Sequence, residues 1–519
     1  MTETPVTGAA SQAGKGLLYQ GADWNFHIIR DCYAAIEEIA EKELGLNVFP
    51  NRIEVITSEQ MLDVYTTNGM PVSYSHWSYG KRFAGHENAY RRGLMGLAYE
   101  VVINSNPCIS YLMEENSATM QALVIAHAAF GHNHFFKNNR LFQEWTDPSQ
   151  ILNYLEFARG YISRCEETHG LEAVERILDA AHALQGQGVN RHSGSRRIDL
   201  KGEQERARER RAWEDRSFND LWRTLPPVNE PEIEPDGAKS AIRRQFGLPE
   251  ENILYFLEKH APRLAPWERE IIRIVRLIAQ YFYPQPQLKL MNEGCATWVH
   301  DRIMTRLHEL GRIDDAAYME TIHSTTNVIT QFGYDQGSTS FNPYALGFAM
   351  MKDIARICTD PTDEDRRWSP DIAGNNDPLG TLRHAWAEYR DESFVLQFLS
   401  PRVMRDFRMF RLLDDTRDPY LLVDAIHDEA GYRDIRRTVA ASYDPSAWYA
   451  EIEVVDVDTY GDRTLRLEHR TRQGQLLAEN DMKLTLKGLA DLWGYRVILQ
   501  EIDAPSGRLL ASHEAIAHN

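Results

Sequence analysis

The sequence lacks several features that would assign it to a class of protein at once. Its 519 residues include five cysteines, and these are far apart with no CxxC pair among them. An odd, scattered set argues against a disulfide framework and predicts reduced, mostly buried thiols. Apolar runs stay shorter than the ~18 residues of a membrane-spanning helix, and the first residues lack the apolar core of a secretion signal. These absences predict a soluble, cytoplasmic protein.

Positive charge is also scarce compared with negative charge. The 57 Lys and Arg residues face 76 Asp and Glu residues, which gives a net charge of −19. This excess argues against a general nucleic-acid binder and against strong attraction to anionic lipid, so we expect neither nucleic acid nor membrane as a partner. The P-loop, GxGxxG and GxSxG motifs and the HExxH zinc motif are missing. ATP chemistry and serine hydrolysis are therefore not expected.

What the sequence does contain is mainly helical periodicity. We predict a disordered leader at residues 1–20 and a large helical body at 21–378. A charged, proline-rich stretch at about 186–247 predicts a mobile insertion in that body. Residues 379–519 show strand-like alternation around a Gly-Asp turn, followed by a helix and a strand. The predicted fold class is mostly α, with a smaller C-terminal α+β domain.

Three histidines lie close together in the stretch "VIAHAAFGHNHFFKNNR". His127 and His134 are seven residues apart, whereas His132 is five residues from His127 and poorly aligned with it on a regular helix. Gly131 could loosen the helix, and a π-bulge there could bring His132 beside His127. His134 is the one of the three whose role is most readily structural.

A second constellation is "MNEGCATWVH". Glu293 and His300 are two helical turns apart and share a face. The small residues Gly294 and Ala296 would let another helix or a ligand approach closely. Asn292 could orient either polar group by a hydrogen bond.

The two constellations together predict one metal site. Two imidazoles from one helix and a carboxylate and an imidazole from another suit zinc, iron or manganese. We predict that the divalent metal is held by His127, His132, Glu293 and His300, with Glu115 or Glu293 as general base. The alternative is a set of core polar groups that are satisfied internally.

Several other side chains are candidates for supporting the site or its substrate. Asn116 lies eleven residues before His127, close to three helical turns, and His323 lies on a later helix. Lys137 and Arg140 could hold a substrate carboxylate or phosphate. The aromatic and basic loop that contains His76 suits an anion or a sugar, although a packed loop is the favoured interpretation. The full set of supporting candidates comprises Asn116, His134, Asn292, His323, Lys137 and Arg140.

The motifs also resemble a known family. The segments "AHAAFGHNHFFKNNR", "MNEGCATWVH", "NPYALG", "FLSPRVMRDF" and "IHDEAGYRDIRR" occur in this order, and together they are similar to the SpoVR family, the stage V sporulation protein R family. The resemblance extends from about Trp24 to about Ile502. It matches His127 and His132 to the family's paired histidines, and Glu293 and His300 to its NEGxAxxxH segment. Cys295 stands where Trp is frequent, and His134 where Asp is frequent.

This resemblance implies a physiological setting but no defined reaction. It links the chain to formation of the spore cortex or to stress and stationary-phase physiology. It implies as partners an AAA+ serine protein kinase and a von Willebrand A-like protein. Three hypotheses follow: a metal-dependent hydrolase acting on a peptide or amide bond, a non-catalytic scaffold or regulatory partner of the kinase system, and a non-haem iron or redox protein. For the last hypothesis, the sequence lacks the paired ExxH motif of di-iron bundles.

Overall fold

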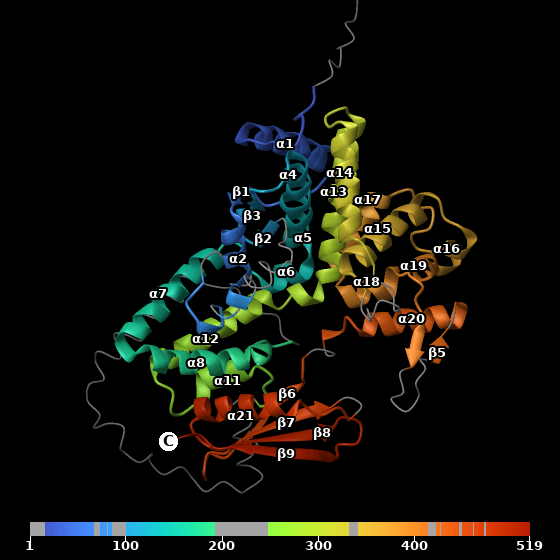
Figure 1. Ribbon diagram of the computed structural model, residues 1–519. Coiled ribbons are helices and arrows are strands. Elements are labelled where there is room, and N and C mark those ends of the chain that lie inside the picture. Colours follow the sequence, from blue (N-terminus) through green and yellow to red (C-terminus); the bar gives the residue numbers. More distant parts are fainter. Residues whose placement is uncertain are drawn as a thin grey trace, which may run out of the picture.

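The computed structural model describes most of the chain and shows a helical body with a smaller sheet-containing unit (Figure 1). The described residues are 16–66, 73–79, 81, 83–85, 100–191, 248–331, 341–413, 422–425, 427–445, 449–459, 461–471 and 474–518. The predicted leader and the predicted charged insertion fall mostly outside these ranges. Within them, no helix is both long and apolar enough to cross a membrane.

The first half of the body combines helices with a small sheet. Its elements are α1 (Phe26–Glu38), η1 (Ile39–Glu43), β1 (Asn51–Ile56), α2 (Ser58–Thr66), β2 (Glu100–Ile103), β3 (Cys108–Met113), α4 (Ala118–Val124), η2 (Ile125–His132), α5 (Asn133–Asn138), α6 (Arg140–Trp145), α7 (Ile151–His169), α8 (Leu171–Ala183) and η3 (Gln185–Gln187). The strand order is β1-β3-β2, with β1 parallel and β2 antiparallel to β3. The sheet packs against η2 and thereby positions the candidate site.

In the residues that the structure describes, the second half of the body is helical apart from one short pair of antiparallel strands. Its elements are α11 (Ile253–His260), α12 (Pro266–Phe282), η5 (Gln285–Gln287), α13 (Lys289–Glu309), α14 (Asp315–Val328), α15 (Pro343–Thr359), α16 (Asp363–Trp368), α17 (Pro378–Glu388), α18 (Asp391–Phe398), α19 (Pro401–Asp406), β4 (Arg411–Leu413), β5 (Leu422–Ala425) and α20 (Glu429–Ala441). Helix α13 runs through the centre of this body, between η2 and α15 (Figure 1). One large apolar core surrounds it.

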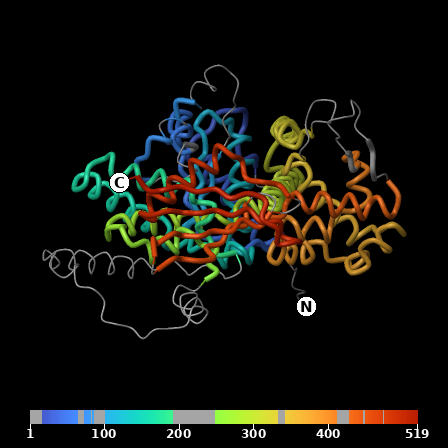
Figure 2. The backbone as a smooth tube through the Cα atoms, turned by 90° about the horizontal axis from the view of Figure 1, so that it is seen from below, coloured from blue at the N-terminus to red at the C-terminus, as the bar shows by residue number. Residues whose placement is uncertain are grey.

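The C-terminal unit is a four-stranded sheet with one helix. It consists of β6 (Ile452–Val457), β7 (Leu465–Thr471), α21 (Glu479–Trp493), β8 (Val497–Asp503) and β9 (Leu509–Ala515), and the strand order is β6-β7-β8-β9. Helix α21 lies between this sheet and α8, where a second apolar core forms. Seen from below, the sheet lies across the helical body (Figure 2). The predicted class, a helical body with a C-terminal α+β domain, is confirmed.

Two details of the predicted organisation differ from the structure. Helices α17, α18 and α20 lie within the range assigned to the C-terminal domain, yet they pack into the core around α13. The packing thus places the transition near residue 450 rather than near 378. The helix on which Asn116 was expected to lie with His127 begins only at Ala118, because Cys108–Met113 forms the central strand of the first sheet.

Candidate metal centre

The histidine-containing helix widens into a π-helix where the histidines lie. Helix α4 continues as η2, which spans Ile125–His132. A π-helix pairs residue i with residue i+5, so His127 and His132 come to the same side of the helix. Their ring centroids are 4.6 Å apart, with the rings nearly perpendicular. The geometric prediction that a π-bulge brings His132 beside His127 is therefore confirmed.

Helix α13 approaches η2 closely because small residues meet at their crossing. A Cβ atom added to Gly131 would lie 2.5 Å from the Cα atom of Ala296, so a larger residue at 131 does not fit. On its other side, α13 meets α15 at Gly294, where an added Cβ would lie 2.7 Å from the Gly347 backbone. These contacts bring Glu293 and His300 to the two histidines of η2.

A further side chain, Glu100, joins the group from the small sheet. Glu100 is the first residue of β2 and pairs with Leu112 of β3. One donor atom each from Glu100, His127 and His132 lie within 4.8 Å of one another, and this is the one such group of potential metal ligands among the described residues. Sequence reasoning missed Glu100, because a single glutamate at the start of a strand gives no signal by spacing.

The distances among these donors suit a divalent ion. The Nε2 atom of His127 is 3.6 Å from Oε1 of Glu100, and Nε2 of His132 is 3.6 Å from Oε2 of Glu293. Two donors that bind one tetrahedral ion at about 2.1 Å stand roughly 3.4 Å apart. The buried Oε2 atom of Glu293 has no hydrogen-bond partner among the described groups. Two imidazoles and two carboxylates, one with an unsatisfied oxygen, therefore form a donor set that fits zinc, iron or manganese.

Hydrogen bonds behind the histidines fix their orientation. His132 bonds through Nδ1 to Oδ1 of Asn292 at 2.9 Å. Because an amide oxygen only accepts, Nδ1 carries the proton and the lone pair of Nε2 faces the site. Asn292 therefore orients His132, whereas the sequence had suggested Glu293 or His300 as the group that it orients.

His300 stands behind His127. Its Nδ1 atom is 2.9 Å from Nδ1 of His127, and its Nε2 atom is 3.1 Å from Oγ1 of Thr325. Both ring nitrogens of His300 are thus engaged in hydrogen bonds. This arrangement suits a residue that orients His127 better than the metal-ligand role predicted for His300.

Burial favours the neutral forms of His127, His300 and Glu100. Burial, and then the neighbouring His132 and His300, hold the pKa of His127 well below its usual value. Burial, and then His132, lower the pKa of His300 to about 3. Burial, and then the Glu293 carboxylate, raise the pKa of Glu100 to about 8. Neutral imidazoles are the form that binds a metal, and a cation would favour the carboxylate form of Glu100.

A cavity gives access to the site. It has a volume of about 490 Å³, and its wall includes Glu100, His132 and Glu293. Lys289, at the start of α13, lines the same cavity and is exposed. A closed structural metal site has no such opening, whereas a catalytic site keeps one position accessible.

Some predicted site residues lie elsewhere. Glu115 is exposed in the turn after β3, and no contact described for it joins it to the histidines. Asn116 is in the same turn, before Ser117 caps α4, so it does not share a helical face with His127. The prediction for Asn116 was wrong because the helix begins at Ala118, after the first residues of the apolar pattern in the sequence. His323 is exposed on α14, beside Asn327.

The remaining candidates have structural roles. Nδ1 of His134 accepts a hydrogen bond from the Asn47 backbone, and its ring packs on Trp386. Lys137 donates to the Val48 carbonyl oxygen at 2.6 Å. Arg140 is on the surface and pairs with Glu144 at 2.8 Å. Neither cation points into the candidate metal centre, so these contacts give no support to a substrate-binding role.

Comparisons with known proteins identify the kinship. A family model described as "SpoVR like protein" matches residues 23–447, and one described as "SpoVR-like C-terminal domain" matches residues 450–504. The chain belongs to the SpoVR family. The predicted resemblance, from about Trp24 to about Ile502, is confirmed over nearly the same span.

A curated relative shares most of this chain. It is "Uncharacterized protein YcgB" from Escherichia coli (strain K12), which is 49% identical over 485 residues. These cover 93% of this chain and 94% of that protein. No solved structure matches the SpoVR-family chain. The division between the two family models, near residue 450, coincides with the start of the C-terminal sheet unit.

Proposed function

We propose that this SpoVR-family chain is a metal-dependent hydrolase whose ion is held by Glu100, His127 and His132. The observation that carries the proposal is the convergence of these donors, with Glu293, at the wall of an open cavity. Two histidines and one carboxylate are the ligands of several catalytic zinc sites. We infer a peptide or amide bond as the target, as expected from the sequence.

The residues around the ion have distinct tasks in this proposal. When bound, a divalent ion supplies Lewis acidity and lowers the pKa of a coordinated water to about 7. Glu293 lines the cavity, and its Oε2 atom, which has no hydrogen-bond partner among the described groups, takes the proton of the attacking water. Asn292 and His300 hold the imidazoles of His132 and His127 in the binding orientation. Lys289 at the cavity wall attracts a negatively charged group of the substrate.

Elemental analysis of the purified protein tests the metal site. We expect one equivalent of zinc, iron or manganese in the wild type and none in the His127→Ala, His132→Ala double variant. A matched control is His27→Ala with His323→Ala, which removes two exposed histidines outside the site and keeps the metal. Circular dichroism checks that each variant folds. A wild type that takes up no metal, even after incubation with each ion under anaerobic conditions, contradicts the proposal.

A substitution of Glu293 distinguishes a general base from a metal ligand at this position. Glu293→Gln keeps the metal but lowers the rate of hydrolysis in a screen of peptide and amide substrates by about 10²–10⁴-fold. Loss of the metal in this variant would instead make Glu293 a ligand.

The same ligand set also occurs in non-haem iron enzymes, so the identity of the metal is informative. Zinc in the protein as isolated supports the hydrolase, and iron together with oxygen consumption supports an oxidative reaction. If no form binds metal, the protein is better described as a scaffold for the proposed AAA+ serine protein kinase and von Willebrand A-like partners. Pull-downs with those proteins then become the next test. The link to spore-cortex formation or to stress and stationary-phase physiology stays a prediction.

A further inference from the structure

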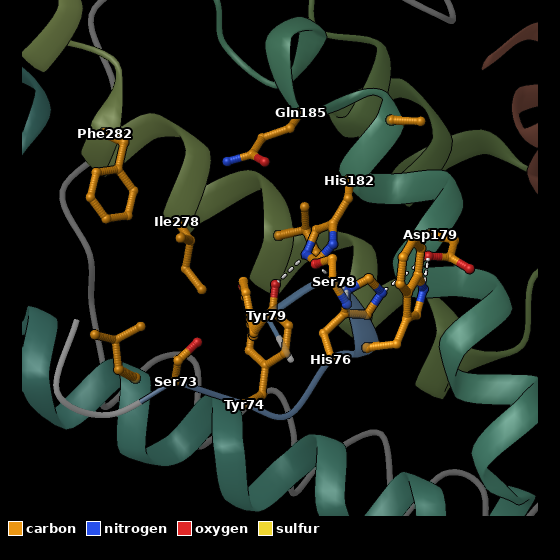
Figure 3. A pocket seen from close by; sticks show the side chains of 14 residues that line it. Ser73, Tyr74, His76, Ser78, Tyr79, Asp179, His182, Gln185, Ile278 and Phe282 are labelled. Carbon is orange, nitrogen blue, oxygen red and sulfur yellow. Dashed lines mark hydrogen bonds and ion pairs between the residues drawn. The ribbon is translucent and has the colours of Figure 1, made fainter. Parts of the chain in front are cut away.

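A second polar cluster lines a cavity of its own, which shares no lining residue with the cavity at the metal centre. This cavity has a volume of about 330 Å³ and lies between α8, α12 and the segment around His76. Figure 3 shows Ile278 and Phe282 on one side and His76, Ser78, Asp179 and His182 on the other. One wall is therefore apolar and the opposite wall carries ionisable and hydroxyl groups.

A hydrogen-bonded chain of carboxylate, imidazole and hydroxyl crosses the polar wall. Nε2 of His76 is 3.1 Å from Oδ1 of Asp179, and Nδ1 of His76 is 2.7 Å from Oγ of Ser78. Because the Asp179 carboxylate accepts, Nε2 carries the proton and Nδ1 keeps a lone pair for the Ser78 hydroxyl. This is the tautomer that a general base needs.

The chain is held in place on its buried side. The side chain of His76 is only 2% exposed, whereas that of Asp179 is 49% exposed. The indole N–H of Trp77 donates to the same oxygen of Asp179 at 2.7 Å, which fixes the carboxylate. The ring of His182 contacts His76 edge to face, with centroids 4.6 Å apart, and Nε2 of His182 lies 2.5 Å from the Tyr74 hydroxyl. The imidazole base is thus oriented from several directions.

We propose that Ser78, His76 and Asp179 form a second, metal-independent hydrolytic site for small esters with an apolar acyl or aryl group. The order of nucleophile, base and orienting carboxylate is that of a catalytic triad, with the two ring nitrogens exchanged. Here Nδ1 faces the hydroxyl and Nε2 the carboxylate. The apolar wall of Ile278 and Phe282 receives the acyl or aryl group. The Gln185 side chain lines the same cavity and supplies an N–H donor to the oxyanion.

The proposed reaction balances with water as the only co-reactant. Oγ of Ser78 forms a bond to the ester carbonyl carbon while its proton passes to Nδ1 of His76. The carbon–oxygen bond to the alcohol then breaks, and His76 returns the proton to the leaving alcohol. A water molecule, deprotonated by His76, cleaves the acyl-serine, releases the carboxylic acid and restores Ser78.

The first experiment is covalent labelling of the full-length protein with a fluorescent fluorophosphonate. We expect one label per chain, located on Ser78 by tandem mass spectrometry and abolished in Ser78→Ala. The matched control is Ser75→Ala, which removes an exposed serine of the same segment that does not line the cavity and keeps the label. The proposal is overturned if Ser78→Ala is still labelled, or if the native protein is labelled no faster than the denatured protein.

Hydrolysis of 4-nitrophenyl acetate provides a second readout. We expect Asp179→Asn to lower kcat at least 10²-fold with little change in KM, because the imidazole loses its correct tautomer. Activity should be unchanged by EDTA and in the His127→Ala, His132→Ala variant, so failure of this site and failure of the metal centre are distinguishable. Activity that disappears with EDTA would assign hydrolysis to the metal centre and overturn the proposal.

Discussion

At the scale of single residues, the candidate metal centre depends on partners that touch no metal. Asn292 holds His132 through Nδ1, and His300 holds His127 in the same way. Such hydrogen bonds select the ring tautomer and strengthen the ligand. The two imidazoles are therefore oriented before an ion arrives.

Asn292→Ala tests this orientation. Without the amide oxygen, His132 loses the acceptor that keeps its proton on Nδ1, and we expect zinc affinity to fall by about 10–100-fold. A competition titration with a chromophoric chelator measures the change. Asn327→Ala, an exposed asparagine on α14, is the matched control and should bind like the wild type. Equal affinity in both variants would contradict the role of Asn292.

Asp365 makes a contribution to stability that depends on pH. Burial alone would raise its pKa, but hydrogen bonds from Arg356 and Thr362 outweigh burial and lower it to about 2. The two bonds to Arg356, at 2.7 and 2.9 Å, connect α15 to α16. Because the folded pKa lies below the unfolded value of about 4, the contribution is complete above that value. It is lost as pH falls through about 2.

We expect Asp365→Asn to unfold more easily than the wild type at pH 7, with a difference that shrinks between about pH 4 and pH 2. Urea unfolding at a series of pH values measures it. The exposed Asp371→Asn should follow the wild type throughout. A difference that stays constant down to pH 2 would mean that the charge of Asp365 is not responsible.

At the residue level, the sequence predicted that the helical residues of the site lie together, while their role as metal ligands stays a prediction. His127, His132 and Glu293 could be identified from the sequence because each is a polar residue among the apolar residues of a predicted helix, where core packing alone does not call for a polar side chain. Glu100 could not, since it comes from a strand and meets the histidines only through tertiary packing. Lys137 looked available for a substrate, but the loop at Val48, distant in sequence, accepts its hydrogen bond.

At the scale of secondary-structure elements, close helix packing forms the site. Gly294 and Gly347 let α13 and α15 touch through their backbones, and Gly131 does the same for η2 against Ala296. The sequence predicted this close helix packing in part, because Gly294 and Ala296 are small residues near Glu293. It did not indicate which helix would fill the space, since that depends on pairing between distant segments.

Gly294→Ala would push α13 away from α15. Its Cβ would lie 2.7 Å from the Gly347 backbone, and backbone cannot move aside as a flexible side chain can. We expect a loss of about 1–3 kcal/mol in the free energy of unfolding, together with weaker metal binding. Gly160→Ala in α7 is the control, because its nearest atom is 3.4 Å away on the Arg164 side chain and alanine favours a helix. In thermal melting, we expect the melting temperature to fall for Gly294→Ala and to rise for Gly160→Ala. An unchanged melting temperature of Gly294→Ala would refute the packing argument.

At the scale of the whole molecule, the second of the two apolar cores joins the helical body to the C-terminal sheet. The second core combines residues of α8, α11 and α12 with residues of α21 and the sheet. Trp493 is 2% exposed, stacks near Phe256 of α11 and donates its indole N–H to the Arg463 carbonyl oxygen. The C-terminal unit is therefore a part of the core and not an appendage. The alternation of apolar and polar residues predicted the strands of this unit. No pattern in the sequence predicted that the unit docks on α8.

Trp493→Ala should destabilise the protein by about 3–5 kcal/mol, because it leaves a cavity between the two units. Leu484→Ala on the same helix is the control, since Leu484 is 72% exposed and its loss should change stability by at most about 0.5 kcal/mol. Chemical denaturation measures both. Equal effects of the two substitutions would mean that α21 does not dock as described.

The metal centre draws its groups from segments far apart in the chain. His132 and Asn292 are 160 residues apart in sequence, and His127 and His300 are 173 residues apart. During synthesis, the two histidines of η2 therefore leave the ribosome long before Glu293 and the residues that orient them. A nascent chain holds an incomplete and weak site, and closing so long a loop comes late in folding. If the chain holds the proposed metal, metal uptake therefore follows translation, and the supply of free ion at that moment limits how much metal-loaded protein a cell contains.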